Sequence, residues 1–333
     1  MKAIIFDKRE LLHIENIATP IPKDNELLVK IIASGFNPID YQMRENKEET
    51  KRLHSPVLGR EFSGVVTSIG KNVKDFKPGD AVFCGSGSMG SNGTYAEYIS
   101  VPESIVALKP DSLSFQQAAA LPSVGLTALQ CLNRMKLQPN HTVFITGGAG
   151  GVGAMFIKIF LTKEFQNFVV TAGNPESIAS LLGLGVKENQ IINYHQDDII
   201  NEAFARNNNQ AFDFVLDLVG NMMSEIAGKV IKTNGTYVDV TAYSTATARS
   251  FLFNKGANIF NISNYVYSLD QNYAYYKNGL NELVNLIEHT SVTPPVIKIV
   301  GSLSINTVER AHSQMRNNQT KGKKLVMQVS TEK

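Results

Sequence analysis

Cysteine is scarce in this sequence, and its scarcity excludes several ways of holding a fold together. Only Cys84 and Cys131 occur among 333 residues, whereas small secreted domains built on disulfides carry many more. No C-x-x-C pair occurs, so a four-cysteine structural zinc site is excluded. The sequence opens with an apolar patch of only four residues before charges return, unlike a signal peptide. We therefore expect a protein of the reducing cytoplasm.

A surplus of charge of one sign and a long apolar run are also missing. The 32 basic residues nearly balance the 30 acidic ones, for a formal net charge of +2, so electrostatics gives no reason to expect a nucleic-acid or membrane partner. No apolar stretch approaches the length that spans a bilayer, and no low-complexity tract indicates extended disorder. A chain of 333 residues that is 43% hydrophobic is longer than one core usually supports. Two globular domains are expected.

The most informative segment is a glycine-rich turn between two apolar runs. Residues 143–146 are typical of a buried strand, and residues 154–161 are typical of a buried helix. Between them, Gly148, Gly150 and Gly153 match G-x-G-x-x-G, the pattern of dinucleotide-binding turns. We expect Gly148 to permit the tight turn, Gly150 to let the backbone approach a pyrophosphate, and Gly153 to let helix and strand pack closely.

This turn would offer a dinucleotide the N-terminus of the following helix. The N–H groups of Gly151 and Val152 belong to its first turn, where backbone donors lack intrahelical acceptors and the helix dipole favours a phosphate. A glycine-rich connection without a ligand remains the alternative. The order of strand, turn and helix favours the dinucleotide site.

The pattern of expected secondary structure changes along the chain. Up to about residue 122, short β-rich runs alternate with turns, as in a small barrel or sandwich. From about 123 to 263, strands alternate with helices, as in a parallel sheet with crossover helices. Residues 279–289 have the spacing of an amphipathic helix, and a strand pair is expected near 295–300 and 324–329. The strands expected in the alternating region are 143–146, 168–171, 191–194, 212–218 and 235–240.

Several motifs, in order along the chain, resemble those of one enzyme family. Besides the glycine turn they are Gly35–Asp40 (GFNPID), Leu58–Val66 (LGREFSGVV), Gly93–Tyr98 (GTYAEY), Leu121–Ala128 (LPSVGLTA) and Gly322–Val326 (GKKLV). The chain resembles the medium-chain dehydrogenase/reductases over nearly its whole length, and among them the zinc-independent quinone oxidoreductase branch.

The resemblance implies an α/β fold with two domains. A Rossmann-type doubly wound parallel sheet, residues 123–263, is expected as the dinucleotide-binding domain. It is inserted into a GroES-like, partly open β-barrel domain made of residues 1–122 plus 264–333. The resemblance also implies a homodimer formed through edge strands of the nucleotide domain.

The resemblance also identifies where a catalytic zinc would be bound. Zinc-dependent relatives carry a Cys, His, Cys triplet, and the matching positions here are Asn37, Arg60 and Ser123. None is a good zinc ligand, because zinc prefers thiolate, imidazole or carboxylate. The histidines show no i,i+4 pairing that rebuilds a site, and each is expected to be a surface or capping residue. They are His13, His54, His141, His195, His289 and His312. We expect no metal.

Without a metal, the reaction must be one that a nicotinamide performs with modest help. Alcohol oxidation at neutral pH needs a Lewis acid or a base that makes the alkoxide accessible. Hydride delivery to a quinone or an α,β-unsaturated carbonyl needs only an oriented acceptor and a stabilised oxyanion or enolate. The expected activity is reduction of a small quinone or enone by a nicotinamide coenzyme.

The end of the second strand of the dinucleotide domain indicates which coenzyme is used. NAD-selective sites place Asp or Glu there, about 20 residues past the glycine turn, to bind the ribose 2′-hydroxyl. Here residues 171–175 read TAGNP, with Asn174 and no carboxylate. Relatives that prefer NADPH often have a tyrosine after the third strand, which Tyr194 matches, and a lysine near Ser177, which this chain lacks. We expect a modest preference for NADPH over NADH.

Other coenzyme contacts follow from the resemblance and from position in the sheet. They are expected at Asn37, Thr127, Val219, Gly220, Thr241 and Lys323. Thr127 is expected to begin the first helix of the inserted domain, near the nicotinamide. Val219, Gly220 and Thr241 follow two strands at the carboxyl edge of the sheet, where ligands of such folds bind. Ordinary strand-to-loop turns are the alternative for these positions.

The group that assists the reduction is expected on one loop or beside it. Asn37, first, has an amide that would donate to a substrate carbonyl. Tyr41, second, has a phenolic proton, although an ordinary phenol is a slow acid. Arg60 would stabilise developing negative charge, or would form a salt bridge to Glu61 or Asp40. Asp40 itself is expected to satisfy backbone N–H groups of its turn.

Two other functions remain open at this stage. One is a true alcohol dehydrogenase of the same superfamily, which uses no zinc or rebuilds a site. The other is a nucleotide-binding protein with a sensing or structural role, because members of this family serve as lens proteins and RNA binders. The balanced charge argues against RNA.

Overall fold

The computed structural model describes residues 1–7, 11–196 and 198–331, and the chain divides into two units. Unit 1 contains Met1–Leu126, Tyr265–His289 and Pro294–Lys333, and unit 2 contains Thr127–Asn264 and Thr290–Thr293. The chain passes between the units after Leu126 and after Asn264, and it returns to unit 2 at Thr290–Thr293. Across the described ranges, no helix combines the length and the apolar character that crossing a membrane requires.

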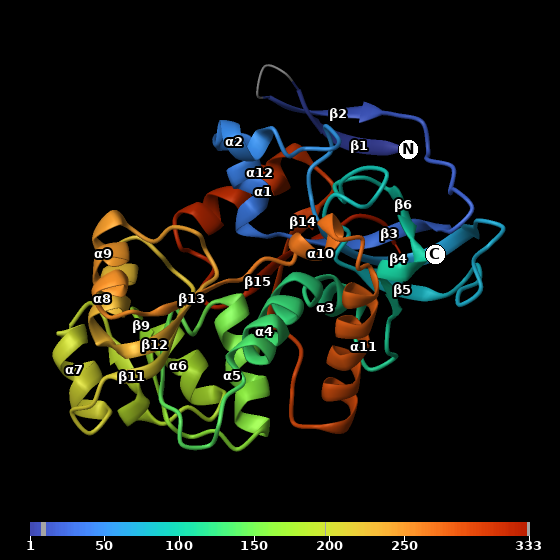
Figure 1. The fold of residues 1–333 in the computed structure, drawn as a ribbon. Coiled ribbons are helices and arrows are strands. Elements are labelled where there is room, and N and C mark those ends of the chain that lie inside the picture. The colour runs from blue at the N-terminus through green and yellow to red at the C-terminus, as the bar shows by residue number, and fades with distance from the viewer. Residues whose placement is uncertain (8–10, 197, 332–333) are drawn as a thin grey trace. The chain divides into compact units, whose positions relative to one another are not determined.

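The sheet of unit 2 has six parallel strands in the order β10-β9-β8-β11-β12-β13. Figure 1 labels β9, β11, β12 and β13 of this sheet. The chain winds outward from β8 through β9 and β10 on one side, and from β11 through β12 and β13 on the other. This is the Rossmann-type doubly wound order, so the parallel sheet expected from the sequence is confirmed. The strands are β8 (Val143–Thr146), β9 (Phe168–Ala172), β10 (Ile191–Asn193), β11 (Phe212–Asp217), β12 (Ile231–Asp239) and β13 (Asn258–Asn261).

Helices connect the strands of unit 2 because apolar residues recur there at helical spacing. They are α4 (Pro122–Met135), α5 (Gly151–Thr162), α6 (Pro175–Gly183), η2 (Glu188–Gln190), α7 (Ile199–Arg206), α8 (Met222–Val230) and α9 (Ala246–Asn254). Asn174 and Asp198 begin α6 and α7, where their side chains accept hydrogen bonds from backbone N–H groups of the first turn. Phe144 of β8 and Phe212 of β11 meet in the core, with ring centroids 5.4 Å apart.

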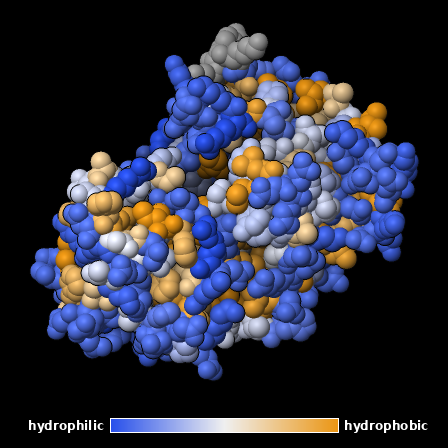
Figure 2. Space-filling view, in the orientation of Figure 1, coloured by the Kyte–Doolittle hydropathy of each residue, from blue (hydrophilic) through white to orange (hydrophobic). Residues whose placement is uncertain are grey.

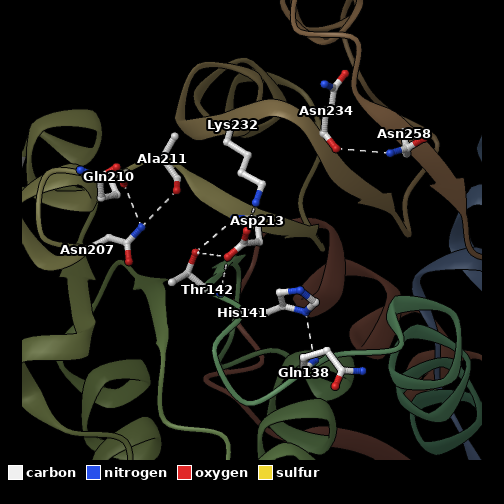
Figure 3. A network of polar contacts seen from close by, with 10 residues as sticks. All are labelled: Gln138, His141, Thr142, Asn207, Gln210, Ala211, Asp213, Lys232, Asn234 and Asn258. Atoms are coloured by element: carbon white, nitrogen blue, oxygen red, sulfur yellow. Dashed lines mark hydrogen bonds and ion pairs between the residues drawn. The ribbon is translucent and has the colours of Figure 1, made fainter.

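The amino ends of three strands are joined by a polar network (Figure 3). Thr142 donates to Asp213 Oδ2 from its backbone N–H at 2.8 Å and from its hydroxyl at 2.9 Å, and Lys232 forms an ion pair with the same carboxylate. Burial alone would raise the pKa of Asp213, but the hydrogen bonds from Lys232 and Thr142 lower it. The network fixes β8, β11 and β12 at the edge opposite to the one where ligands of such sheets bind.

The main sheet of unit 1 has seven strands, and the long strand β3 (Glu26–Gly35) is central. One edge of β3 pairs with β4, whereas the other is divided between β6, at residues 26–30, and β15, at residues 33–35. Strands β14 and β15 pair in parallel, so the strand pair expected at the end of the chain is confirmed. The other six strands of this sheet are β4 (Glu61–Ile69), β5 (Ala81–Cys84), β6 (Tyr98–Pro102), β7 (Val106–Leu108), β14 (Ile297–Ser302) and β15 (Lys324–Gln328). Strands β1 (Lys2–Phe6) and β2 (Leu12–Asn16) form a separate antiparallel pair.

The helices of unit 1 lie between its strands along the chain. They are α1 (Pro38–Glu45), α2 (Lys47–Thr50), η1 (Glu103–Ile105), α3 (Phe115–Ala119), α10 (Val266–Leu269), α11 (Ala274–His289) and α12 (Ile305–Arg316). The helix expected over 279–289 is therefore longer, because it begins at Ala274. Two cysteines, Cys84 in β5 and Cys131 in α4, are buried and free.

One histidine lies inside the core of unit 1. His312 is 1% exposed and lies on the buried face of α12, four residues after Val308. Its ring meets Phe36 at right angles, with ring centroids 6.0 Å apart. The prediction that every histidine is a surface or capping residue is wrong for His312, because the helical period carries it to the inner face.

Candidate functional site

The glycine turn of unit 2 connects β8 to α5. Gly147 has the positive φ of the turn, at +66°, whereas Gly148 is required for packing, because an added Cβ would lie 2.1 Å from Val170 Cγ2 in β9. At Gly153 an added Cβ would lie 2.6 Å from the Gly148 carbonyl oxygen. Gly153 therefore has the close-packing role expected from the sequence. The turn itself depends on Gly147, and the expectation that Gly148 provides it is wrong in detail.

The same turn leaves the start of α5 open. Gly150 is the N-cap and is exposed, and only the Gly147 carbonyl oxygen, at 3.3 Å, would approach an added Cβ there. The helix begins at Gly151, so the backbone N–H groups of Gly151 and Val152 lie in its first turn. Donors of a first helical turn have no intrahelical acceptor and suit a phosphate. The residues present fit the diphosphate of a dinucleotide.

The end of β9 has a small, uncharged surface beside a tyrosine. An added Cβ at Gly173 would lie 2.0 Å from Tyr194 Cζ, so the Tyr194 ring packs directly on this glycine. The Tyr194 N–H donates to the Ala172 carbonyl at 3.1 Å, which continues the β9–β10 pairing past the end of β10. Asn174 caps α6 by accepting from the Ser177 N–H at 2.8 Å. Tyr194 and Asn174 therefore lie at the same edge of the sheet.

A buried carboxylate organises the carboxyl end of β11, and the sequence interpretation missed it. Asp217 is 0% exposed and accepts from the Thr146 hydroxyl and from the Tyr237 hydroxyl, both at 2.6 Å. Its Oδ1 also accepts from the N–H groups of Val219 at 3.1 Å and Gly220 at 2.9 Å. Asp217 thereby joins the ends of β8, β11 and β12. A carboxylate at the end of an apolar strand is the signal that identifies it.

The predicted contacts near Asp217 also come together. An added Cβ at Gly147 would lie 2.7 Å from Val219 Cγ2, and one at Gly220 would lie 2.6 Å from Thr241 Oγ1. Val219 is 41% exposed beside the glycine turn. Thr127, by contrast, is inside a helix that begins at Pro122, so the expectation that it begins that helix is wrong. Its hydroxyl accepts from Asn264 Nδ2 at 3.0 Å.

Unit 1 contains a second group of functional candidates, around a buried ion pair. Lys324 Nζ donates to Glu61 Oε1 at 2.6 Å, to Asn37 Oδ1 at 2.7 Å and to the Phe36 carbonyl at 2.9 Å. The Lys324 side chain is 8% exposed and that of Glu61 is 0% exposed. Glu61 begins β4 and Lys324 begins β15, so the pair joins two strands that both border β3.

Glu61 also brings together two of the three positions that match zinc ligands. Its Oε1 accepts from Asn37 Nδ2 at 2.8 Å, and its Oε2 accepts from the Ser123 backbone N–H at 2.8 Å. The Asn37 side chain therefore donates one amide hydrogen to Glu61 and accepts from Lys324 through its oxygen. Its second amide hydrogen remains for another acceptor. An ammonium group, an amide and a backbone N–H surround this carboxylate. This donor set does not fit zinc.

Arg60, the third position, is only partly exposed and has no strong partner. Its guanidinium contacts Met43 Sδ at 3.4 Å, and within the described ranges no carboxylate forms an ion pair with it. Burial lowers the pKa of Arg60, and the nearby Asp40 carboxylate opposes that shift. The salt bridge considered between Arg60 and Glu61 does not occur, because Glu61 is bound by Lys324.

Asp40 is buried at the first turn of α1. Its Oδ2 accepts from the Asn37 backbone N–H at 2.8 Å, as expected for a turn carboxylate. Burial raises the pKa of Asp40 to about 6, and Arg60 and Lys324 limit the rise. Asp40 Oδ1 is buried and has no hydrogen-bond partner among the described residues. A carboxyl group that titrates close to neutrality thus lies beside Arg60.

Two predicted residues lie away from this group. Tyr41, on α1, packs its ring against His312, with centroids 6.4 Å apart, and under the Arg316 guanidinium at 6.0 Å. Lys323 is exposed, whereas its neighbour Lys324 is the lysine that joins the cluster. Sequence reasoning missed Glu61 and Lys324, although a charged residue in an apolar strand is the signal for both.

Two family models match this chain. The alcohol dehydrogenase GroES-like domain covers residues 23–111, and the zinc-binding dehydrogenase model covers residues 186–326. A solved structure, the quinone oxidoreductase from Coxiella burnetii, is 30% identical, covers 99% of both chains and has a TM-score of 0.81. The chain belongs to the medium-chain dehydrogenase/reductase superfamily. The Rossmann-type and GroES-like domains expected from its motifs are thereby confirmed.

Two relatives within this superfamily are plant reductases. The chloroplastic NADPH-dependent alkenal/one oxidoreductase of Arabidopsis thaliana is 28% identical over 339 residues, which is 99% of this chain and 80% of the relative. The 2-methylene-furan-3-one reductase of Solanum lycopersicum is 32% identical over 243 residues, 71% of this chain. This chain spans 60% of the length of that second relative.

Proposed function

We propose that this protein is an NADPH-dependent reductase that delivers hydride to quinones or α,β-unsaturated carbonyl compounds without a metal ion. The plant relatives bear the names of an NADPH-dependent alkenal/one oxidoreductase and a 2-methylene-furan-3-one reductase, and the Coxiella burnetii relative that of a quinone oxidoreductase. The observation that carries the proposal is the chemistry at the zinc-ligand positions, where Asn37 and Ser123 bind Glu61 of a buried Glu61–Lys324 ion pair and Arg60 occupies the third position.

Unit 2 is proposed to hold the coenzyme at the carboxyl edge of its sheet. The first turn of α5, at Gly151 and Val152, would bind the diphosphate, and the turn at Gly220 would border the nicotinamide half. A reduced nicotinamide coenzyme bound there supplies the hydride. The protein's part is to fix its orientation and to exclude water.

The preference for NADPH is proposed from the end of β9. The uncharged segment at Gly173 and Asn174 offers no carboxylate that would repel a 2′-phosphate, and the Tyr194 ring packs beside it. The test is the ratio of kcat/KM for NADPH and NADH with one acceptor. A ratio above one supports the proposal, and a ratio below one overturns this part of it.

Arg60 is proposed to stabilise the oxyanion or enolate of the acceptor. Its guanidinium has unused donors and lies in a partly enclosed position, where a charge-assisted hydrogen bond gains strength. Asn37 has one amide hydrogen left to donate, and Tyr41 would supply a proton only if the acceptor reaches α1. Rates of single-turnover hydride transfer in Asn37→Ala and Tyr41→Phe test these two residues, and unchanged rates in both remove them from the chemistry.

The experiment that tests the function is NADPH consumption against ortho-quinones, para-quinones, alkenals and simple aldehydes. Turnover of the quinones or alkenals, with little turnover of simple aldehydes, is expected. Arg60→Met should lower kcat/KM by about 10²–10³-fold, the usual effect of losing an oxyanion donor. Arg52→Met is the matched control, because Arg52 is an exposed arginine paired with Glu49. Coenzyme binding without turnover of any acceptor would favour a non-catalytic role.

A homodimer in the reducing cytoplasm is the expected setting. Strand β13 is an edge of the unit 2 sheet, and Ile259 on it is 48% exposed. Such an edge offers unpaired backbone groups to a second copy. Sedimentation equilibrium at several concentrations tests this, and a monomer throughout would overturn it.

A further inference from the structure

A chain of buried polar side chains leads from α12 to Asp40 through the apolar core of unit 1. The Arg44 guanidinium lies 3.3 Å from His312 Nδ1, and His312 Nε2 lies 3.3 Å from the Tyr95 hydroxyl. Tyr95 is 0% exposed, and His312 and Asp40 are each 1% exposed. Apolar side chains would fill such positions at lower cost, because buried polar groups are stable only when hydrogen-bonded. This row of buried polar side chains therefore indicates a functional role.

The chemistry of Arg44 fixes the direction of these hydrogen bonds. A guanidinium only donates, so His312 Nδ1 must accept, and the proton of a neutral imidazole is then on Nε2. Burial and the charges of Arg44 and Arg316 lower the pKa of His312 to about 3, so the ring is neutral at working pH. His312 Nε2 thus donates to the Tyr95 oxygen.

The Tyr95 proton must then point to another acceptor. Burial raises the pKa of Tyr95 well above its usual value, and the Asp40 charge and a side-chain hydrogen bond with Asp40 add to the rise. The phenol therefore keeps its proton and directs it to Asp40. Asp40 Oδ2 already accepts from the Asn37 N–H, so the buried Oδ1, which no other described group binds, is the oxygen open to the Tyr95 hydroxyl. The remaining charged groups that act on Asp40 are Arg60, Glu61 and Lys324.

We propose that Tyr95 and His312 are positioning residues, which hold the Asp40 carboxylate ionised beside Arg60 through a hydrogen-bond chain that runs in one direction from Arg44. An ionised Asp40 compensates the charge of Arg60 and anchors the loop of Asn37, whereas a protonated Asp40 does neither. This role rests on the proposed function, because it concerns the group proposed to stabilise the acceptor oxyanion.

The test is the titration of the Asp40 carboxyl by infrared difference spectroscopy in the free protein, which needs no turnover. Asp40→Asn assigns the signal by removing it. In Tyr95→Phe the titration should move upward by about one to two pH units, because a hydrogen bond to a charged acceptor is lost. The matched control is Tyr98→Phe, in β6, which should leave the titration in place. An unshifted titration in Tyr95→Phe would overturn the proposal.

His312 variants test the direction of the chain. If Tyr95 donated to His312 instead, His312→Leu would free the phenol for Asp40 and would move the titration downward. The proposed direction predicts no shift or a small upward one. In His312→Gln the amide can both donate to Tyr95 and accept from Arg44, so the Asp40 titration should match that of the wild type. This variant keeps the test available if His312→Leu fails to fold.

Kinetics then connects the chain to the reaction. The fall of kcat/KM at low pH should follow the Asp40 titration, move upward in Tyr95→Phe and be absent in Asp40→Asn. A protein without NADPH turnover would overturn the proposed function and leave the infrared result standing. If the protein turns over NADPH but Tyr95→Phe shifts neither the pH profile nor the infrared titration, the hydrogen-bond chain is wrong and the proposed function stands.

Discussion

Lys324 Nζ lies 2.6 Å from Glu61 Oε1, and both side chains are buried where unit 1 brings strands β4 and β15 to opposite edges of β3. Glu61 also holds Asn37 and Ser123. Two of the three positions where zinc-dependent relatives carry their ligands are thus joined by an internal ion pair. The ion pair sets the geometry of the loop on which the proposed chemistry depends.

Breaking this pair from one side should be costly. Lys324→Met leaves a buried, unpaired carboxylate, so we expect the free energy of unfolding in urea to fall by about 3–5 kcal/mol. The double variant Lys324→Met/Glu61→Gln should recover part of that loss, because no uncompensated charge remains. Lys323→Met is the control, and this exposed neighbour should stay within about 0.5 kcal/mol of the wild type. A Lys324→Met as mild as Lys323→Met would contradict the pairing.

Replacing Asp40 should stabilise the fold at neutral pH. Its folded pKa of about 6 lies above the unfolded value of 3.8, so the stability that protonated Asp40 provides is lost as pH rises between these values. The ionised form then costs roughly 3 kcal/mol at pH 7. Asp40→Asn keeps an oxygen for the Asn37 N–H and should unfold at higher urea than the wild type at pH 7, with lower kcat/KM. The gain in stability should disappear below about pH 4, and a gain that persists there has another cause.

Replacing Asp217 should weaken coenzyme binding as well as the packing of the strands. Asp217→Asn replaces an acceptor that binds Thr146, Gly220 and Tyr237, which should loosen the turn at Gly220. We expect the Kd for NADPH, measured by fluorescence titration, to rise about tenfold. Thr142→Val is the control at the other end of the same sheet (Figure 3), where stability should fall without a change in Kd. If Asp217→Asn and Thr142→Val raise the Kd for NADPH equally, the coenzyme is not bound specifically at the carboxyl edge of the sheet.

A methyl group at Gly173 should displace the Tyr194 ring. The added Cβ would lie 2.0 Å from Tyr194 Cζ, so Gly173→Ala cannot keep the ring in place. If Tyr194 borders the 2′-phosphate, kcat/KM should fall for NADPH more than for NADH. Gly183→Ala, at the end of α6, is the control, since nothing lies within 4 Å of its added Cβ. Equal losses for both coenzymes would remove Tyr194 from the choice between them.

Local features of this chain could be predicted from sequence, whereas distant pairings could not. The glycine turn and the strands around it depend on neighbouring residues and apolar periodicity, which the sequence displays directly. Glu61 and Lys324 are 263 residues apart, and Tyr95 and His312 are 217 apart. No local pattern predicts either pair, because the partners meet only once the unit 1 sheet has formed and α12 has packed. Figure 2 shows polar and apolar residues interspersed over the face that it draws, so hydropathy alone does not single out a site on that face either.

The most direct test of metal-free hydride transfer is the fate of the label from NADPH deuterated at the transferring C4 position, with an α,β-unsaturated ketone as acceptor. The zinc content of the same sample is measured by elemental analysis. We predict one deuterium on the β-carbon of a saturated ketone, and activity that survives chelation without stoichiometric zinc. Deuterium on the carbonyl carbon of an allylic alcohol, with one zinc per chain and activity lost on chelation, would contradict the account.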